Sequence, residues 1–313
     1  MENAMKRKQV SGQAILLVVL TLAVVLTLIL SVVSRSITDV KVTSVEEESV
    51  RAFSAAEAGI ERHLTDYSYT FSPFTINDVE VTGNITPKYE NQSEMNYPEK
   101  LKEGEVATVW FVDHDDNGNL TCGAGSTCYA ASNANNANLR LCWGETGGID
   151  AAAEISIYYA FTPGNYSDIR VARYAVDSSA GRRAINNFKP NQRGLGGCTS
   201  VGSEGIGYRR RVTIDLDDSG SERFNIPDNV IRSPNGLLFA RIRFFYNGSV
   251  GVPFGVTLPS GGGNNVFASQ ARLIQSSGKF GEAERKVEIT ALYPDLPPIF
   301  DYSLFALGGG VSQ

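Results

Sequence analysis

Residues 12–33 read Gly-Gln-Ala-Ile-Leu-Leu-Val-Val-Leu-Thr-Leu-Ala-Val-Val-Leu-Thr-Leu-Ile-Leu-Ser-Val-Val and contain no charged side chain. After Gly12 the run also lacks glycine and proline, and most of its residues are Leu, Ile or Val. A helix of this length spans about 30 Å, which matches the hydrocarbon core of a bilayer. The segment from about Gln13 to Val33 is therefore predicted to be a transmembrane helix.

Positive charge lies on one side of this run. Lys6, Arg7 and Lys8 precede it against a single Glu2, and the first charge beyond it is Arg35. Basic residues beside a membrane span stay on the cytoplasmic side, so the N-terminus is predicted to be cytoplasmic and the rest of the chain to lie outside. The expected protein crosses the cell membrane once and presents an extracellular head.

Three interpretations fit the N-terminus. The first is a secretory signal peptide, although such peptides have apolar cores of about 7–15 residues, and its cleavage would leave a soluble chain beginning near Arg35. The second is an uncleaved signal anchor. In the third, residues 1–12 are a leader removed on the cytoplasmic side, so that the mature chain begins at Gln13 and keeps the apolar run. Gly12 favours the third, because a residue without a Cβ atom can enter a narrow peptidase site.

The helical pattern continues beyond the membrane segment without a break. Apolar or small residues recur at steps of three and four, which predicts an amphipathic helix. This stripe consists of Val42, Val45, Ser49, Phe53, Ala56, Ile60 and Leu64. Glu47 and Arg51 form a favourable i,i+4 pair on the same helix. A single helix from Gln13 to Leu64 is therefore predicted, and its stripe requires a surface to cover it.

Two motifs taken together resemble a known family. The segment Gly12-Gln-Ala-Ile-Leu-Leu-Val and the later block Arg51-Ala-Phe-Ser-Ala-Ala-Glu-Ala-Gly-Ile resemble the N-terminal region of PilX-type minor pilins. The resemblance covers about residues 12–62 and implies a subunit of a type IV pilus. It implies cleavage between Gly12 and Gln13 by a prepilin peptidase, with membrane lipid and other pilin subunits as partners. The implied assembly helix includes Leu17, Phe53, Ala56, Glu57, Gly59 and Ile60.

Leu17 departs from the pattern of most major pilins. Counted from Gln13, it occupies the fifth mature position, where those proteins carry a Glu that pairs with the N-terminal amine of a neighbouring subunit. A leucine cannot form that ion pair, and a buried unpaired amine is costly. PilX-type minor pilins and the tip pseudopilin of type II secretion share this absence. The resemblance therefore implies a role in pilus initiation or at the tip, with display for adhesion outside the cell.

Residues 65–313 are predicted to form a β-rich head, which makes the fold class α+β. Short runs of β-branched and aromatic residues alternate with Gly-rich turns. The expected strands are 74–81, 105–112, 139–143, 154–161, 169–176, 209–216, 237–246, 250–256, 271–277 and 285–293. We expect an antiparallel sheet packed on the helix stripe and a β-sandwich inserted into it. Gly, Arg and Asn crowd residues 181–207, which predicts a boundary between two subdomains there.

Two of the expected strands show a clear alternation of polar and apolar residues. In Ala240-Arg-Ile-Arg-Phe-Phe-Tyr and Lys286-Val-Glu-Ile-Thr-Ala-Leu the alternation predicts one face in water and one face buried. The proline-rich stretch 294–306 that follows is predicted to be an extended strap on the head, with a frayed tail as the alternative.

Four cysteines lie beyond the membrane segment. An even number of cysteines in an exported domain favours disulfides over free thiols or a zinc site. The preferred pairs are Cys122–Cys128, which closes a short Gly- and Ser-rich loop, and Cys142–Cys198. A Cys122–Cys142 pair is the alternative.

Two acidic turns resemble the opening of a calcium loop, in which oxygen-bearing residues alternate and a glycine follows. Neither has the glutamate that completes such a loop at the twelfth position. Each follows an expected strand, so a simple hairpin turn explains both without a metal ion. No cofactor is expected, and calcium is kept as an alternative. Its candidate ligands are Asp113, Asp115 and Asn117 in the first turn and Asp215, Asp217 and Ser219 in the second.

Other functions find less support in the sequence. The net charge of −6 argues against a nucleic-acid partner, and with two histidines and no catalytic motif the chain is not expected to be an enzyme. One alternative is a pseudopilin of a secretion system. Another is a membrane-anchored β-sandwich protein that binds carbohydrate or protein. Its binding surface would be an aromatic platform of Trp110, Trp143, Tyr158, Tyr159 and Tyr166, although packing in the core is the expected use of these rings.

Overall fold

The computed structural model describes residues 11–65, 67–191, 197–198, 200–217, 222–258, 263–295 and 297, and at 11–13, 136 and 263 the backbone only. The chain divides into two compact units. The first comprises the residues up to Gly59, Ser72–Gly83 and Ser276–Val287; the second comprises Ile60–Phe71, Asn84–Gln275 and the chain from Glu288. One long helix and mainly antiparallel sheets make the fold α+β, as predicted.

Helix α1 runs from Ser11 to Leu64. Its 54 residues span about 81 Å at 1.5 Å per residue. The helix contains no proline, so nothing interrupts its backbone hydrogen bonds. The predicted pair forms, with 2.6 Å between Arg51 Nη2 and Glu47 Oε1. The single long helix predicted from Gln13 to Leu64 is therefore confirmed.

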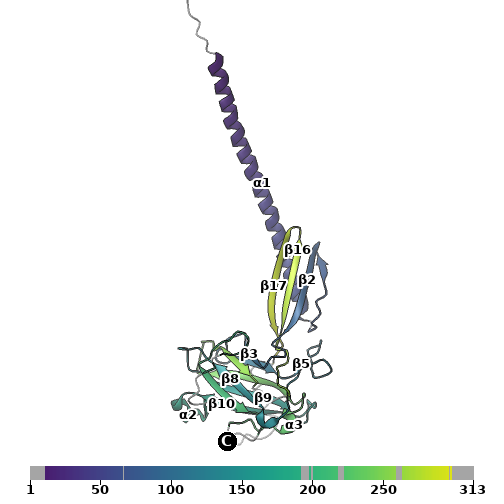
Figure 1. The fold of residues 1–313 in the computed structure, drawn as a ribbon, viewed down its shortest axis with the longest axis vertical. Helices are drawn as coiled ribbons and strands as arrows, with labels where there is room; N and C mark the ends of the chain where they lie inside the picture. Colours follow the sequence, from purple (N-terminus) through teal and green to yellow (C-terminus); the bar gives the residue numbers. More distant parts are fainter. Residues whose placement is uncertain are drawn as a thin grey trace, which may run out of the picture. The chain divides into compact units, whose positions relative to one another are not determined.

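Strands β2 (Val79–Lys88), β16 (Ala271–Phe280) and β17 (Ala283–Leu292) lie side by side in a four-stranded sheet, with β1 (Phe74–Ile76) at its edge (Figure 1). Between β1 and β2 the chain turns at Asn77 and Asp78, whose φ angles are 48° and 63°. This left-handed geometry suits a tight hairpin. The single strand predicted over 74–81 is therefore wrong, because the Asn-Asp turn reverses the chain within it.

The second unit contains a β-sandwich. Its sheets have the strand orders β11-β10-β9-β13-β4 and β12-β8-β14-β3. The first sheet comprises β4 (Val106–Trp110), β9 (Ala152–Ala160), β10 (Ile169–Asp177), β11 (Lys189–Pro190) and β13 (Leu237–Phe245). The second comprises β3 (Glu94–Asn96), β8 (Asn138–Trp143), β12 (Arg210–Asp215) and β14 (Phe254–Thr257). Residues of both sheets share one hydrophobic core, in which the rings of Phe244 and Phe254 meet edge to face.

Strands from before and after residues 181–207 share each sheet of the sandwich. β9 pairs with both β10 and β13, and β8 pairs with both β12 and β14. The boundary predicted near 181–207 therefore does not divide the head. That stretch contains the short helix α2 (Ala180–Asn186) and strand β11 instead.

Shorter elements complete the described fold. They are β5 (Asp113–His114), β6 (Leu120–Thr121), β7 (Ala130–Ala131), the 3₁₀ turn η1 (Ala134–Asn136), α3 (Asp228–Ile231) and β15 (Gly263–Asn264). The strand predicted over 250–256 begins only at Phe254. Its first part is a turn, in which Val250 N donates to the carbonyl of Asn247.

Both faces of β13 are buried, contrary to the alternation argument. Its outward-pointing Arg241 and Arg243 are 4 % and 8 % exposed. The wet face predicted for residues 240–246 is therefore wrong. In β17 Lys286 and Glu288 are exposed as predicted, but Ile289 also remains partly open to solvent.

Candidate functional site

The N-terminal half of α1 presents apolar side chains to its surroundings. Every side chain from Ala14 to Val33 is exposed, including Leu17. In the described part of the chain, α1 is the one helix long and apolar enough to cross a membrane, which is consistent with a single-pass anchor. Gly12 and Gln13 lie in its first turn, and their side chains are outside the described residues, as is the leader up to residue 10.

The buried face of α1 differs from the predicted stripe. It consists of Ala52, Ala55, Ala56, Gly59, Ile60 and His63. Of the predicted stripe, Val42, Val45, Phe53 and Leu64 are exposed, Phe53 by 45 %. Ala56 and Ile60 are buried as expected. The stripe prediction is therefore wrong in its large residues, and small residues occupy most of the covered face.

Small residues are required there because strand β16 approaches the helix backbone closely. A Cβ atom added to Gly278 would lie 2.1 Å from the carbonyl oxygen of Ala52. A Cβ atom added to Gly59 would lie 2.1 Å from the Oγ atom of Ser276 and 2.9 Å from Cγ1 of Val81. These distances are well inside van der Waals contact, so glycine is needed on both the helix and the strand. The Ala-Ala-Glu-Ala-Gly part of the sequence motif therefore has a packing role within the first unit.

Two other members of the motif point away from the sheet. Phe53 and Glu57 are exposed, on a face of α1 different from the one that carries Ala52 and Ala56. Polar contacts with the β16–β17 turn and with the start of β17 hold the helix just before these two residues. Glu282 N donates to Glu48 Oε2 at 3.1 Å, and Arg285 Nε donates to Ser49 Oγ at 2.7 Å. The motif thus combines a covered small face with an exposed aromatic and acidic one.

A buried arginine caps the end of α1. The Nη1 and Nη2 atoms of Arg272 donate to the carbonyl oxygens of His63 and Leu64 at 3.1 and 3.2 Å. The side chain is 2 % exposed, and its guanidinium lies over the ring of Tyr67. Carbonyls in the last turn of a helix lack partners within the helix and carry partial negative charge. Sequence reasoning missed Arg272, because a lone arginine in a strand gives no sign that it reaches a helix end.

Aromatic side chains cluster between the segment after α1 and the sandwich within the second unit. The hydroxyls of Tyr69 and Tyr293 lie 2.5 Å apart, and the ring of His114 stacks on Tyr293 with 3.9 Å between centroids. Trp110 contacts His114 edge-on at 4.5 Å. Burial lowers the pKa of His114 to about 4, so its imidazole is neutral near pH 7. His114 therefore acts here as a packed aromatic ring.

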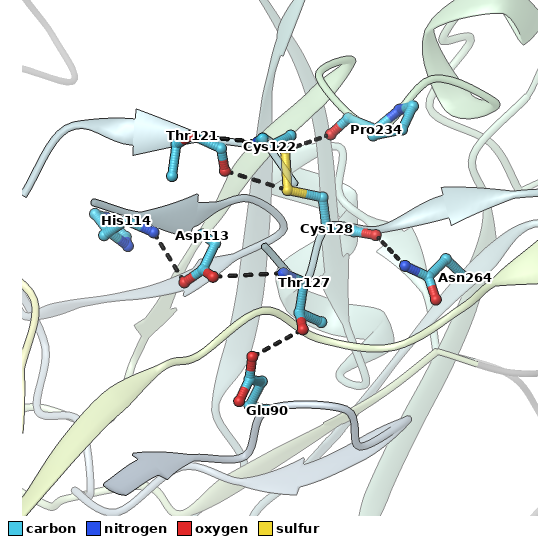
Figure 2. The surroundings of a disulfide bond; sticks show 10 residues. Glu90, Asp113, His114, Thr121, Cys122, Thr127, Cys128, Pro234 and Asn264 are labelled. Atoms are coloured by element: carbon cyan, nitrogen blue, oxygen red, sulfur yellow. Dashed lines mark hydrogen bonds between the residues drawn. A yellow bond between two sulfur atoms is a disulfide. The ribbon is translucent and has the colours of Figure 1, made fainter. Parts of the chain in front are cut away.

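Both preferred disulfides are present. Cys122 pairs with Cys128 and Cys142 pairs with Cys198, which excludes the alternative Cys122–Cys142 pair. Figure 2 shows the first bond beside β5, with the carbonyl of Cys128 accepting a hydrogen bond from Asn264 Nδ2. The second bond ties β8 to the segment that leads into β12.

Backbone N–H groups donate hydrogen bonds to Asp113 and Asp115, two of the predicted calcium ligands in the first acidic turn. Asp113 Oδ1 accepts from the backbone N–H of His114, and its Oδ2 accepts from that of Thr127 (Figure 2). Burial raises the pKa of the Asp113 carboxyl. Asp115 Oδ1 accepts from the backbone N–H groups of Asn117 and Asn119 at 2.9 and 2.8 Å. The turn is thus a hairpin between β5 and β6 that is held by its own hydrogen bonds.

The second acidic turn follows β12. Asp217 is fully buried, and burial together with the charge of Asp217 raises the pKa of Asp215. Ser219, the third predicted ligand, lies outside the described residues. Among the described residues there is no group of three His, Cys, Asp or Glu side chains that could hold a metal ion.

The five aromatic residues of the alternative platform do not share an exposed surface, and most of them are packed inside the protein, as expected. Trp143 of β8 and Tyr159 of β9 lie in the sandwich core. Trp110 of β4 and Tyr158 of β9 are buried outside that core, where both rings contact Phe239. Tyr166 alone of the five is exposed.

Comparison with known proteins identifies no family. A scan against protein-family models found no match, and a search of curated proteins found no match either. The function is therefore argued from the residues and geometry above.

Proposed function

We propose that this chain is a minor type IV pilin or pilin-like subunit that takes part in pilus assembly, at initiation or at the tip. The observation that carries the proposal is the two-part helix α1. Its N-terminal half is apolar and exposed from Ala14 to Val33, and its C-terminal part buries a face of small residues. One continuous helix can therefore cross the membrane at one end and hold a β-rich region at the other.

Assembly would proceed by transfer of the apolar run from lipid to protein contacts. A prepilin peptidase would cut between Gly12 and Gln13, and the run would then pack against the helices of other subunits. Helices associate in lipid through van der Waals packing and small residues rather than through a hydrophobic driving force. Leu17 provides no carboxylate for the N-terminal amine of a neighbouring subunit. This favours a position at the start of the filament, where no earlier subunit presents an amine that must be neutralised.

The exposed Phe53 and Glu57 extend this surface beyond the membrane. Both side chains are exposed on the part of α1 that belongs to the first unit. An exposed phenylalanine beside a carboxylate suits contact with another subunit, because aromatic residues are enriched in protein interfaces. Display of the head outside the cell, for adhesion, would follow from assembly.

The decisive experiment measures the N-terminal mass of the chain isolated from membranes of a cell that carries a prepilin peptidase. We expect a mature chain beginning at Gln13, and we expect Gly12→Val to leave the leader attached while Ser11→Ala is still processed. A chain beginning at Met1 would indicate a plain anchor, and one beginning near Arg35 a cleaved signal peptide; either result would refute the proposal.

A second experiment tests assembly directly. Sheared filaments should contain the native chain and much less of Phe53→Ala, at equal amounts in the membrane. Ile185→Ala is the matched control, since Ile185 is an apolar residue of α2 that is 85 % exposed. Equal incorporation of the two variants would remove Phe53 from the assembly surface. Recovery of the native chain only with a secretion complex would favour the pseudopilin alternative.

A further inference from the structure

An open groove lies within the first unit, between α1 and the β1–β2 hairpin, and has a volume of about 440 Å³. Two of the residues that line it are buried, Ala55 on the helix and Val79 on β2. Two others are exposed, Val50 by 61 % and Ile76 by 37 %. We call it the hairpin groove, and it is defined by Val50, Arg51, Ser54, Ala55, Ile76, Asn77 and Val79.

The hairpin groove suits an uncharged, apolar side chain. Of the described residues that line it, Arg51 alone is charged. Its guanidinium already pairs with Glu47 at 2.6 Å and lies 5.1 Å from the centre of the Phe280 ring, so it needs no carboxylate from a partner. The exposed Val50 and Ile76 supply apolar surface that leaves water when a side chain enters. The volume falls within the range of about 300–1,000 Å³ in which protein pockets hold ligands larger than one aromatic ring.

The same helix presents such a side chain on another side. Phe53 is 45 % exposed and is not among the described residues that line the groove. Successive residues of an α-helix point about 100° apart, so Phe53 and Ser54 face different neighbours. One chain therefore carries both an exposed ring and an apolar groove, and these point to different sides of one helix. Unlike surfaces of this kind pair head to tail between copies of a chain, not across a two-fold axis.

The membrane segment sets the ring and the groove at the same height in neighbouring copies. Each copy has the same apolar run from Ala14 to Val33, so equal positions of α1 lie at equal depth when two anchored helices stand side by side. The helix residues of the groove lie between positions 50 and 55, on both sides of position 53. The axial offset is therefore at most about 4.5 Å, at 1.5 Å per residue. A second copy needs no shift along the membrane normal to place its ring at the groove.

We propose that Phe53 of one copy inserts into the hairpin groove of a second copy, between Ser54 and Ile76, while both are anchored in the membrane and before extraction into a filament. This inference rests on the membrane anchor of the proposed function and adds the surface that receives Phe53. The small side chains of Ser54 and Ala55 allow the second helix to approach closely. Because a different side of each copy supplies the ring and receives it, the contact can continue from copy to copy. The ring is already about half covered, so its full burial favours association roughly 3- to 10-fold.

Photo-crosslinking in the cell membrane tests this contact. Two forms of the full chain are produced together, one with p-benzoylphenylalanine at position 53 and the other with an affinity tag. Crosslinked pairs are recovered through the tag and mapped by mass spectrometry. We expect crosslinks to residues 50–55 or 76–79 of the tagged copy, and none there from the control, which carries the same group at position 185 in α2. Crosslinks to other parts of the tagged copy, or only to other proteins, would overturn the proposal.

A substitution in the groove tests the direction of the contact. Ser54→Trp fills the groove from an exposed position of the helix, so it should lower the yield of crosslinks roughly 3- to 10-fold when the tagged copy carries it. The same substitution in the copy with the photo-reactive group should leave the yield unchanged, because that copy uses its ring and not its groove. Ser36→Trp in the tagged copy is the matched control, since Ser36 is exposed on the same side of α1 about five turns earlier. An equal loss whichever copy carries Ser54→Trp would show a symmetric contact and would overturn the proposal.

The N-terminal mass of the same chains separates this inference from the proposed function. A chain that begins at Gln13 and gives no crosslinks refutes the contact but not the pilin proposal. A chain that still begins at Met1 and gives the expected crosslinks supports the contact and refutes the pilin proposal.

Discussion

Gly59→Ala tests whether the close approach of β16 to α1 determines the packing of this helix. Two effects oppose each other. Alanine is the better helix former by about 1 kcal/mol in a helix interior. Its Cβ atom, however, would lie 2.1 Å from Ser276 Oγ and 2.9 Å from Val81 Cγ1. Overpacking of this kind costs about 1–3 kcal/mol.

We expect the steric cost to exceed the gain in helix propensity. Rotating the hydroxyl of Ser276 does not remove the conflict, because the Cβ atom of Ser276 would itself lie 3.1 Å from the new methyl group. The helix and the strand must therefore separate. This places the steric cost in the upper part of its range, about 2–3 kcal/mol. After the gain in helix propensity of about 1 kcal/mol, a net loss of about 1–2 kcal/mol increases the population of locally opened states roughly 5- to 30-fold.

Hydrogen exchange of the full chain in detergent measures this opening in peptides that cover residues 48–64. Exchange in Gly59→Ala should be roughly 5- to 30-fold faster than in the native chain. Gly181→Ala is the matched control, because Gly181 also lies in a helix, α2. A Cβ atom added to Gly181 would have its nearest neighbour, Ser179 Oγ, at 4.0 Å, which is ordinary contact. There we expect unchanged or slower exchange in peptides from α2.

The double variant Gly59→Ala with Ser276→Gly completes the test. Ser276→Gly removes both the hydroxyl and the Cβ atom that the new methyl group meets, so the two substitutions should couple by at least about 1 kcal/mol. Two results would refute the reasoning. One is exchange in Gly59→Ala that is as slow as in the native chain. The other is a double variant whose loss of stability equals the sum of the losses of the two single variants.

Three further predictions concern the second unit. Arg272→Met should lower the free energy of unfolding by about 2–4 kcal/mol through loss of two charge-assisted hydrogen bonds, and Arg272→Lys should not restore it because one ammonium cannot match the two-pronged guanidinium. Because the pKa of His114 is about 4 in the fold against 6.5 for an ordinary histidine, the unfolded chain binds more protons between these values. The contribution of His114 to the free energy of unfolding is thus complete above pH 6.5 and falls by about 3 kcal/mol as the pH drops to 4. Denaturant titrations at several pH values should find a smaller loss over this range in His114→Phe. Replacing Cys142 and Cys198 with alanine should cost about 4 kcal/mol, against about 2 kcal/mol for Cys122 and Cys128, because the closed loops differ in length, 56 residues against 6; equal losses in thermal unfolding would contradict this ranking.

Local signals in the sequence predicted the helix and the disulfides well. The absence of proline and the three- and four-residue steps are properties of neighbouring residues, and they determine that α1 is one helix. The Cys122–Cys128 pair follows from a short loop that brings the two cysteines together. The Asn-Asp turn between β1 and β2 was also readable, but the β-branched residues on both sides outweighed it in the strand prediction.

The covered face of α1 was not predictable from the helix alone. Choosing the largest apolar residues, Phe53 and Leu64 among them, assumes that the partner surface lies far enough away to accept them. Ser276 and Gly278 bring β16 so close that alanine and glycine fit and larger side chains do not. These two residues are more than 200 positions away in sequence. The size of the buried residues therefore depends on how closely a strand distant in sequence approaches the helix. The sequence of the helix alone does not indicate that spacing.

The wet face predicted for β13 was wrong for the same reason, because its burial depends on segments that are distant in sequence. Alternation shows that Arg241 and Arg243 share one face, which the structure confirms. It does not show what lies over that face. Arginine is a poor indicator of solvent exposure, because a guanidinium can be buried when a carboxylate lies beside it, as Glu154 does beside Arg243 and Asp295 beside Arg241. Carboxylates elsewhere in the chain must therefore be counted before a row of arginines is assigned to water.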